Sequence, residues 1–160
     1  MAHEFRHVQS GDQSVRVAVM GSGPLVLMVH GFPESWYSWR HQLEPIAKAG
    51  FTAAAIDVRG YGGSSKPHPV EAYDMVSIVA DNQAVADQLG GGKAILVGHD
   101  WGAPIVWNTA LMDPQRFTAV AGMSIPHMGH GAAPMIDVSR KKFTENGLLF
   151  CMAPVEDEGD

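Results

Sequence analysis

The chain has 160 residues, a formal net charge of −6 and 46% hydrophobic residues. This length and composition suffice for one hydrophobic core, and the excess of acidic residues argues against nucleic acid or an anionic membrane as a partner. No apolar run approaches the about 18 residues that cross a bilayer, and the first residues do not form a signal-peptide pattern. The single cysteine, Cys151, excludes an internal disulfide. These features predict a cytoplasmic protein that does not contact membranes.

The first predicted elements in chain order are strands. Two short segments at 5–9 and 15–20 flank a turn signal at 11–13, which predicts a β-hairpin. Residues 25–29 form a wholly apolar run of strand length, which is typical of a strand buried on both faces. The chain therefore begins with β-structure.

Helical patterns alternate with further apolar strands after this point. Glu34 or Ser35 begins a predicted helix that continues to Ile46 and stops by Gly50. The later predicted elements are, in order, a strand at 51–56, a loop at 59–69, a helix at 74–89, a strand at 93–97, a helix at about 103–112 and a strand at 117–123. This alternation predicts an α/β fold, with a mostly parallel sheet and helices on both faces.

The strand at 93–97 leads directly into the sequence Gly98-His99-Asp100-Trp101-Gly102. Glycines two positions before and after Asp100 fit a nucleophile elbow, a tight strand–turn–helix bend whose central residue has a strained backbone. His99 is expected to support this bend. Most such elbows carry serine at the centre, and because this one carries aspartate, a serine esterase is excluded. A carboxylate forms an ester by attacking an alkyl carbon, which favours epoxides or alkyl halides as substrates.

A second signal, His30-Gly31-Phe32-Pro33, follows the strand at 25–29. Gly31 allows a tight backbone turn, after which the N–H of Phe32 is expected to point toward the elbow. Together with the N–H of Trp101 it would form a two-donor oxyanion hole. His30 is interpreted as turn support rather than as a catalytic base, and Pro33 is a candidate for a cis peptide bond.

Three segments resemble the epoxide hydrolase branch of the α/β-hydrolase fold superfamily. They are HGFPESWYSWR at 30–40, DVRGYGGSSKP at 57–67 and GHDWGAPIVW at 98–107. They occur in the order that this family has, and the resemblance covers most of residues 1–126. It implies an α/β-hydrolase fold.

The resemblance also implies roles for single residues. It implies that Asp100 is the nucleophile, that Phe32 and Trp101 supply the oxyanion donors, and that both of these and Trp36 line the substrate pocket. A small-molecule epoxide and water are the implied partners, without a cofactor. The family's catalytic histidine, second carboxylate and two cap tyrosines do not map onto this sequence. We therefore expect residues 1–126 to be the N-terminal part of the core and 127–160 the start of a helical cap, truncated there and inactive alone.

Two other functions remain open on the sequence. A haloalkane or haloacid dehalogenase would use the same ester chemistry, with the indole N–H of Trp101 on the departing halide. The resemblance disfavours it, because haloalkane dehalogenases usually carry Asn in place of Phe32 and fluoroacetate dehalogenases favour Arg in place of Trp101. The chain could instead be a non-catalytic fragment. In this chain alone, the apolar strand at 117–123 would be an exposed sheet edge, which predicts that the chain associates with other copies of itself.

The remaining polar signals are interpreted as structural. Asp57, at the end of the strand at 51–56, is expected to fix the following turn rather than act in catalysis. Arg59 and Tyr61 are interpreted as loop scaffolding. The Gly- and Ser-rich loop lacks the spacing of phosphate-binding motifs, and no Cys/His cluster has metal-ligand spacing, so neither a nucleotide nor a metal is predicted.

Overall fold

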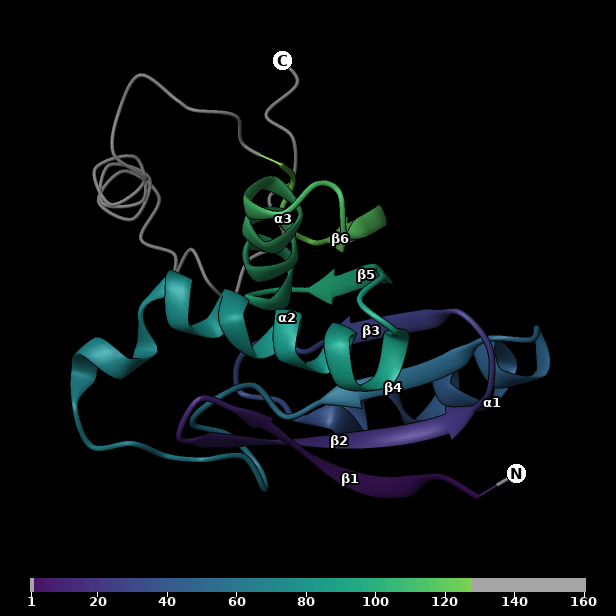
Figure 1. Cartoon of the computed structure of the whole chain (residues 1–160), viewed down its shortest axis with the longest axis horizontal. Coiled ribbons are helices and arrows are strands. Elements are labelled where there is room, and N and C mark those ends of the chain that lie inside the picture. Colours follow the sequence, from purple (N-terminus) through teal and green to yellow (C-terminus); the bar gives the residue numbers. More distant parts are fainter. Residues whose placement is uncertain (1, 128–160) are drawn as a thin grey trace, which may run out of the picture.

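The computed structural model describes residues 2–127 and contains a central six-stranded sheet (Figure 1). In order across the sheet, the strands are β1 (Glu4–Ser10), β2 (Gln13–Gly21), β4 (Thr52–Ile56), β3 (Leu25–Val29), β5 (Ala94–His99) and β6 (Phe117–Met123). Strands β4, β3, β5 and β6 run parallel, whereas β2 is antiparallel to both β1 and β4. The prediction of a mostly parallel sheet is confirmed.

The two antiparallel strands form the predicted hairpin. Ser10 pairs with Gln13 across a two-residue turn, and Gly11 in this turn has a φ of 59°. A positive φ costs glycine little, because glycine has no Cβ atom to collide with the backbone. Strand β2 then continues along β4, with Val17 opposite Ile56. The hairpin thereby extends the parallel sheet by two strands.

Helices cover both faces of the sheet, as predicted (Figure 1). Helices α2 (Met75–Gly90) and α3 (Gly102–Met112) lie on one face, where Val106 belongs to a large cluster of buried side chains. Helix α1 (Arg40–Lys48) lies on the other face, where Leu43 belongs to a second cluster. Successive residues of β3 point into these two clusters in turn, so every residue of this strand is buried. This explains its unbroken apolar sequence.

The ends of helix α2 follow local sequence signals. The carboxylate of Asp74 accepts a hydrogen bond from the N–H of Ser77 at 2.7 Å and so caps the first turn. Gly91 ends the helix in the left-handed conformation, with a φ of 60°. The predicted helix at 74–89 is confirmed within a residue at each end.

Residues 36–46 differ from the single predicted helix. A short 3₁₀ helix, η1 (Trp36–Trp39), comes before α1. Trp36 and Trp39 are three positions apart, and three residues per turn place both on one side, where Trp39 is buried. A second 3₁₀ helix, η2 (Val70–Tyr73), follows the predicted loop and was not predicted.

Strand β6 lies at one edge of the sheet, since within residues 2–127 it pairs with β5 alone. Beyond the buried Phe117 its residues are exposed or half-buried. The predicted domain boundary at residue 126 falls next to the end of the described chain. Apart from His127, the predicted cap segment 127–160 lies outside the described residues.

Candidate active site

The sequence at 98–102 forms a tight bend between β5 and α3. Asp100 at its centre has a φ of 52°, in the left-handed region that non-glycine residues rarely adopt. A Cβ atom at Gly98 would overlap the carbonyl oxygen of Gly102, and one at Gly102 would overlap the carbonyl oxygen of Val29. The two glycines therefore permit the close approach of strand and helix on which the bend depends.

The carboxylate of Asp100 lies against the loop that follows β3. The backbone N–H of Phe32 donates a hydrogen bond to Oδ1 of Asp100 at 2.8 Å. Within residues 2–127, this is the one hydrogen-bond donor on the carboxylate, so the N–H of Trp101 makes no such contact in this arrangement. A Cβ atom at Gly31 would overlap the Asp100 side chain, so this position requires glycine. The two predicted motifs therefore meet at one place, with a main-chain donor on a carboxylate oxygen.

His30 is bound by the backbone on both ring nitrogens. The N–H of Val58 donates to Nε2 at 3.0 Å, so Nδ1 carries the proton and donates to the carbonyl oxygen of Gly31 at 2.8 Å. Burial lowers the pKa of His30 and favours this neutral form. Both ring nitrogens are thus bonded to the backbone of the loops, and the role of His30 as turn support stays a prediction. The following Phe32–Pro33 peptide bond is cis, as considered from the sequence.

Glu34 is a site residue that the sequence reasoning missed. Its Oε2 accepts a hydrogen bond from the N–H of Gly31 at 3.1 Å and lies 3.6 Å from Nδ1 of His99. Glu34 therefore connects the loop after β3 with the elbow. The position of Glu34 directly after the HGFP sequence could have indicated a role in the site. The same position is equally typical of a residue that caps a helix.

A pocket of about 160 Å³ lies beside the elbow, at the carboxyl ends of β3, β4 and β5. Its lining comes from the segments after these strands and from the helices, namely His30, Gly31, Val58, Arg59, Tyr61, Tyr73, Ile78, Trp101 and Ile105. Of the predicted pocket residues, Trp101 lines it, whereas Phe32 and Trp36 do not. The Trp36 ring instead packs against Phe5, with ring centroids 5.1 Å apart. A substrate contact for Phe32 and Trp36 stays a prediction.

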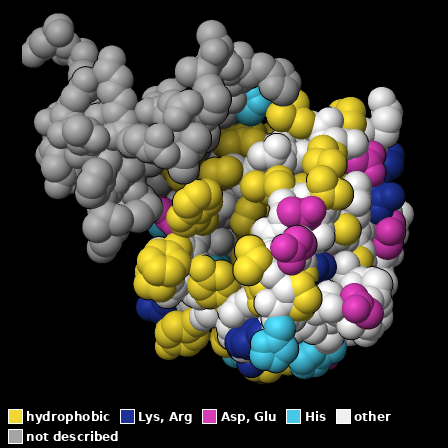
Figure 2. All heavy atoms as spheres, turned by 90° about the vertical axis from the view of Figure 1, so that its left-hand side faces the viewer, with side chains coloured by type: hydrophobic (Ala, Val, Ile, Leu, Met, Phe, Trp, Pro, Cys, Tyr) yellow, Lys and Arg dark blue, Asp and Glu magenta, His cyan; other side chains and the backbone are white. Residues whose placement is uncertain are grey.

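The carboxyl ends of the parallel strands open onto an apolar surface. Phe32 and Trp101, which follow β3 and β5, are each 52% exposed. Figure 2, turned toward this end of the sheet, shows hydrophobic side chains gathered there. Such a surface next to a carboxylate suits an apolar substrate.

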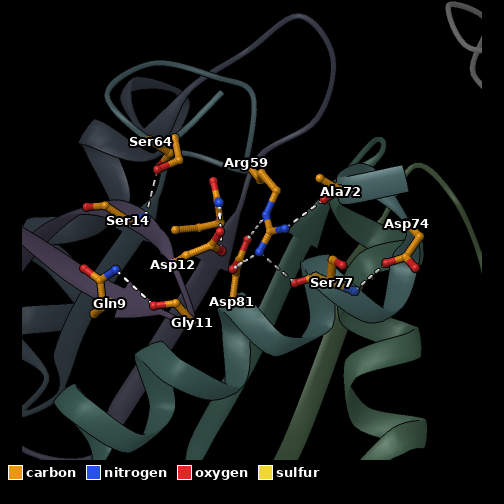
Figure 3. Close-up of polar contacts among 12 residues, drawn as sticks. Gln9, Gly11, Asp12, Ser14, Arg59, Ser64, Ala72, Asp74, Ser77 and Asp81 are labelled. Atoms are coloured by element: carbon orange, nitrogen blue, oxygen red, sulfur yellow. Dashed lines mark hydrogen bonds and ion pairs between the residues drawn. The ribbon is translucent and has the colours of Figure 1, made fainter. Parts of the chain in front are cut away.

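Two carboxylates behind this surface are paired with arginines. Asp57 is fully buried, and both its oxygens accept backbone hydrogen bonds, one of them from Gly63 at 2.8 Å, as expected for a residue that fixes a turn. Arg59 contacts both oxygens of Asp81 on α2, at 2.9 and 2.6 Å (Figure 3). Its guanidinium also donates to the carbonyl oxygen of Ala72 at 2.8 Å. Arg59 thus fixes the segment around η2, and it lines the pocket as well, which its interpretation as scaffolding did not include.

Metal-binding clusters and membrane spans are two further features that the described residues lack. No group of three or more His, Cys, Asp or Glu side chains in residues 2–127 is arranged to hold a metal ion. In the same range, none of the helices has the length and apolar character that a membrane span requires.

Comparison with known proteins shows what the sequence and the fold resemble. A family profile described as the alpha/beta hydrolase fold matches residues 24–146. Epoxide hydrolase A of Mycobacterium tuberculosis is 45% identical over 136 residues, which are 82% of this chain and 42% of that protein. Bifunctional epoxide hydrolase 2 of Mus musculus is 46% identical over 150 residues, which are 94% of this chain and 26% of that protein. This chain thus spans less than half the length of either relative.

Solved structures show the same relationship. An epoxide hydrolase from an endophytic Streptomyces superposes with a TM-score of 0.84 at 51% identity, over 88% of this chain and 42% of that one. Epoxide hydrolase VrEH1 from Vigna radiata superposes with a TM-score of 0.83 at 38% identity, over 89% of this chain and 47% of that one. The described fold is similar to part of each of these structures.

Proposed function

This chain belongs to the alpha/beta hydrolase fold family, and we propose that the full-length protein opens epoxides to diols through a covalent ester on Asp100. The observation that carries this proposal is the 2.8 Å hydrogen bond from the Phe32 N–H to Oδ1 of Asp100. The similarity to enzymes named epoxide hydrolases supports the substrate class. The 160-residue chain holds the nucleophile and one oxyanion donor of this reaction.

In the first step the carboxylate attacks an epoxide carbon. Oδ1 is held by the Phe32 N–H, which leaves Oδ2 as the oxygen free to attack. A bond forms between Oδ2 and the carbon, the carbon–oxygen bond of the epoxide breaks, and its electron pair stays on the departing oxygen. We propose that this oxygen takes a proton from an acid outside residues 2–127, because the two cap tyrosines that the family resemblance implies do not map onto this sequence. The product is a hydroxyalkyl ester of Asp100.

In the second step water attacks the ester carbon, Cγ of Asp100. The carbonyl electron pair moves onto Oδ1, where the Phe32 N–H stabilises the negative charge. Collapse of this intermediate releases the diol together with Oδ2 and leaves one water oxygen in the carboxylate. His30 does not activate the water, since both its ring nitrogens are bonded to the backbone. We propose that the base lies outside the described residues, because the catalytic histidine that the family resemblance implies does not map onto this sequence. We propose that the Trp101 N–H becomes the second oxyanion donor in this step.

Isotope incorporation tests the ester intermediate. The full-length protein is reacted with less than one equivalent of styrene oxide in H₂¹⁸O, and the peptide that contains Asp100 is analysed by mass spectrometry. We expect the peptide to gain one ¹⁸O atom and the first diol formed to carry an unlabelled oxygen from Asp100. If the label appears in the diol alone, water attacks the epoxide directly and the proposed ester mechanism is wrong.

The same preparation separates the proposal from dehalogenation. Incubation with a bromoalkane and measurement of released bromide would detect halide displacement through the same ester. We expect diol formation to exceed halide release, because the position of Phe32 offers a backbone donor and no polar side chain to a halide. Dominant halide release would assign the chain to dehalogenation instead.

Two further features belong to the proposal. We place the protein in the cytoplasm, on the basis of its one cysteine and acidic composition. We also propose that the 160-residue chain by itself associates with other copies through the edge of β6, because that edge is exposed within the described fold.

A further inference from the structure

The loop at 30–36 carries the Phe32 donor. Each end of this loop is hydrogen-bonded to one of two consecutive residues, Asp57 and Val58, that follow β4. At its start, Nε2 of His30 accepts the N–H of Val58 at 3.0 Å. At its end, the N–H of Trp36 donates to Oδ1 of Asp57 at 3.0 Å. One short segment, through the Val58 backbone and the Asp57 side chain, therefore fixes the loop on either side of Phe32.

Asp57 is itself held on every side. Its second oxygen, Oδ2, accepts the N–H of Gly63 at 2.8 Å and Nε of Arg16 at 2.7 Å, and Nη2 of Arg16 lies 2.6 Å from the same oxygen. A Cβ atom at Gly62 would overlap this carboxylate, so the loop packs directly on it. The Asp57 side chain has no exposed surface, and the charge of Arg16 offsets the cost of burying it. With both oxygens occupied, the carboxylate has no freedom to rotate away from Trp36.

From these contacts we infer that Asp57 is a positioning residue that sets the place of the Phe32 N–H through Trp36. This inference rests on the proposed ester mechanism. An oxyanion donor stabilises charge only when it is directed at the oxygen on which charge develops, and small displacements reduce its effect. Among the described residues, Asp57 makes no hydrogen bond to Asp100 and is not part of the pocket lining, so it acts on the reaction through the loop.

The two chemical steps depend differently on this donor. In ester formation Oδ1 loses negative charge, so a weaker Phe32 hydrogen bond does not slow the step. In ester hydrolysis Oδ1 gains charge, so the same weakening slows the step. Release of the loop from Asp57 is therefore expected to slow ester hydrolysis selectively, and the alkylated enzyme is expected to accumulate.

Position 36 offers a matched pair of variants. Trp36→Pro and Trp36→Ala both remove the indole, but only proline removes the N–H that Asp57 accepts. Proline is compatible with this position, because Trp36 is the first residue of η1 and Ser35 before it is extended. The difference between these variants isolates the single hydrogen bond to Asp57.

A second pair changes the carboxylate. Asp57→Asn replaces one of the two oxygens by an amide, so it cannot accept from Trp36, Gly63 and Arg16 together. Asp81→Asn is its control, because Asp81 is also a buried aspartate paired with an arginine but does not contact the loop at 30–36. The second pair does not depend on whether proline is tolerated at position 36.

The experiment is single-turnover kinetics of the full-length protein with styrene oxide, in which rapid acid quench and mass spectrometry follow the Asp100 ester. We expect ester hydrolysis in Trp36→Pro to be slower than in Trp36→Ala by a factor of about ten or more. The rates of ester formation in the two variants should differ by less than about threefold. Asp57→Asn should show the same selective loss relative to Asp81→Asn. Equal loss in both steps, or no difference within the pairs, would overturn the inference and indicate a merely structural Asp57.

Hydrogen exchange gives a readout that does not need the reaction. In peptides that cover residues 30–36, the amides are expected to exchange faster in Trp36→Pro than in Trp36→Ala, and faster in Asp57→Asn than in Asp81→Asn. If the unsubstituted protein forms no Asp100 ester, the proposed function fails, and exchange alone then decides whether Asp57 positions the loop. If the ester forms and exchange is unchanged within both pairs, only the role of Asp57 is wrong.

Discussion

The backbone N–H of Phe32 lies 2.8 Å from Oδ1 of Asp100, although the two residues are 68 positions apart in the chain. The parallel pairing of β3 with β5 creates this contact, because Val29 and Gly98 are register partners near the ends of these strands. Phe32 comes three positions after Val29, and Asp100 comes two positions after Gly98. The nucleophile and its oxyanion donor are therefore placed by the register of two central strands.

The close approach at Gly31 gives the first prediction. In Gly31→Ala the added methyl group would overlap the Asp100 side chain and push it away from the Phe32 N–H. We expect kcat of the full-length protein for epoxide hydrolysis to fall by about 10²–10³, the cost of losing an oxyanion donor. Gly50→Ala is the control for backbone strain without a steric clash, since a Cβ atom there meets nothing within 4 Å while its φ of 89° strains the substitution. Similar losses of kcat in both variants would contradict the prediction.

Buried His30 predicts a dependence of stability on pH. Burial lowers the pKa of His30 below its ordinary value of 6.5, so the unfolded chain binds a proton more readily than the folded one. The contribution of His30 to stability is therefore complete above about pH 6.5 and is lost as the pH falls toward the folded pKa. We expect the free energy of unfolding of the full-length protein, measured by urea denaturation, to decrease as the pH falls from about 6.5 toward the folded pKa.

Substitution isolates that contribution. His30→Asn removes the titrating group, so its stability should be lower at neutral pH but change less on acidification. His68→Asn, at an exposed position, should keep the pH dependence of the unsubstituted protein. A pH dependence of His30→Asn equal to that of the unsubstituted protein would assign the acid sensitivity to other groups.

The ion pair of Arg59 and Asp81 predicts a large loss of stability on substitution (Figure 3). Their side chains are 8% and 2% exposed, so Asp81→Asn leaves a buried guanidinium without its counter-charge. We expect a cost of about 3–5 kcal/mol in urea denaturation. Asp113→Asn is the comparison, since Asp113 pairs with Arg116 at a side-chain exposure of 27% and the expected cost is below about 1 kcal/mol. A cost for Asp81→Asn as small as that for Asp113→Asn would mean that water reaches the Arg59 pair.

The exposed edge of β6 predicts the behaviour of the 160-residue chain in isolation. Size-exclusion chromatography with light scattering should show oligomers or aggregates. Lysine at two exposed positions of this strand, Ala119→Lys and Ala121→Lys, should reduce the measured mass, because charge opposes edge-to-edge pairing. A monodisperse monomer with a cooperative thermal transition would show that the edge needs no cover.

Most of the secondary structure could be predicted because its signals are local. The run at 25–29 and the strand at 117–123 match β3 and β6, and Asp74 and Gly91 end helix α2 by contacts within a few residues. The division of residues 36–46 into η1 and α1 could not be predicted, since it depends on how the tryptophans pack against the sheet. The short helix η2 was missed for a similar reason, because Arg59, from a distant segment, bonds to its carbonyl group at Ala72.

The chemical character of the site follows from the amino-acid sequence alone. The glycines two positions before and after Asp100 predict a bend that residues larger than glycine would not permit. The carboxylate at the centre of this bend favours attack on an alkyl carbon. The groups that surround that carboxylate and its loop are known only from the three-dimensional fold. Glu34 contacts His99, and Asp57 accepts the N–H of Trp36, because the strand register brings separate loops to one end of the sheet. Hydrogen bonds between such loops leave no periodic trace in the sequence, since each requires only one polar group at a position that the whole fold defines.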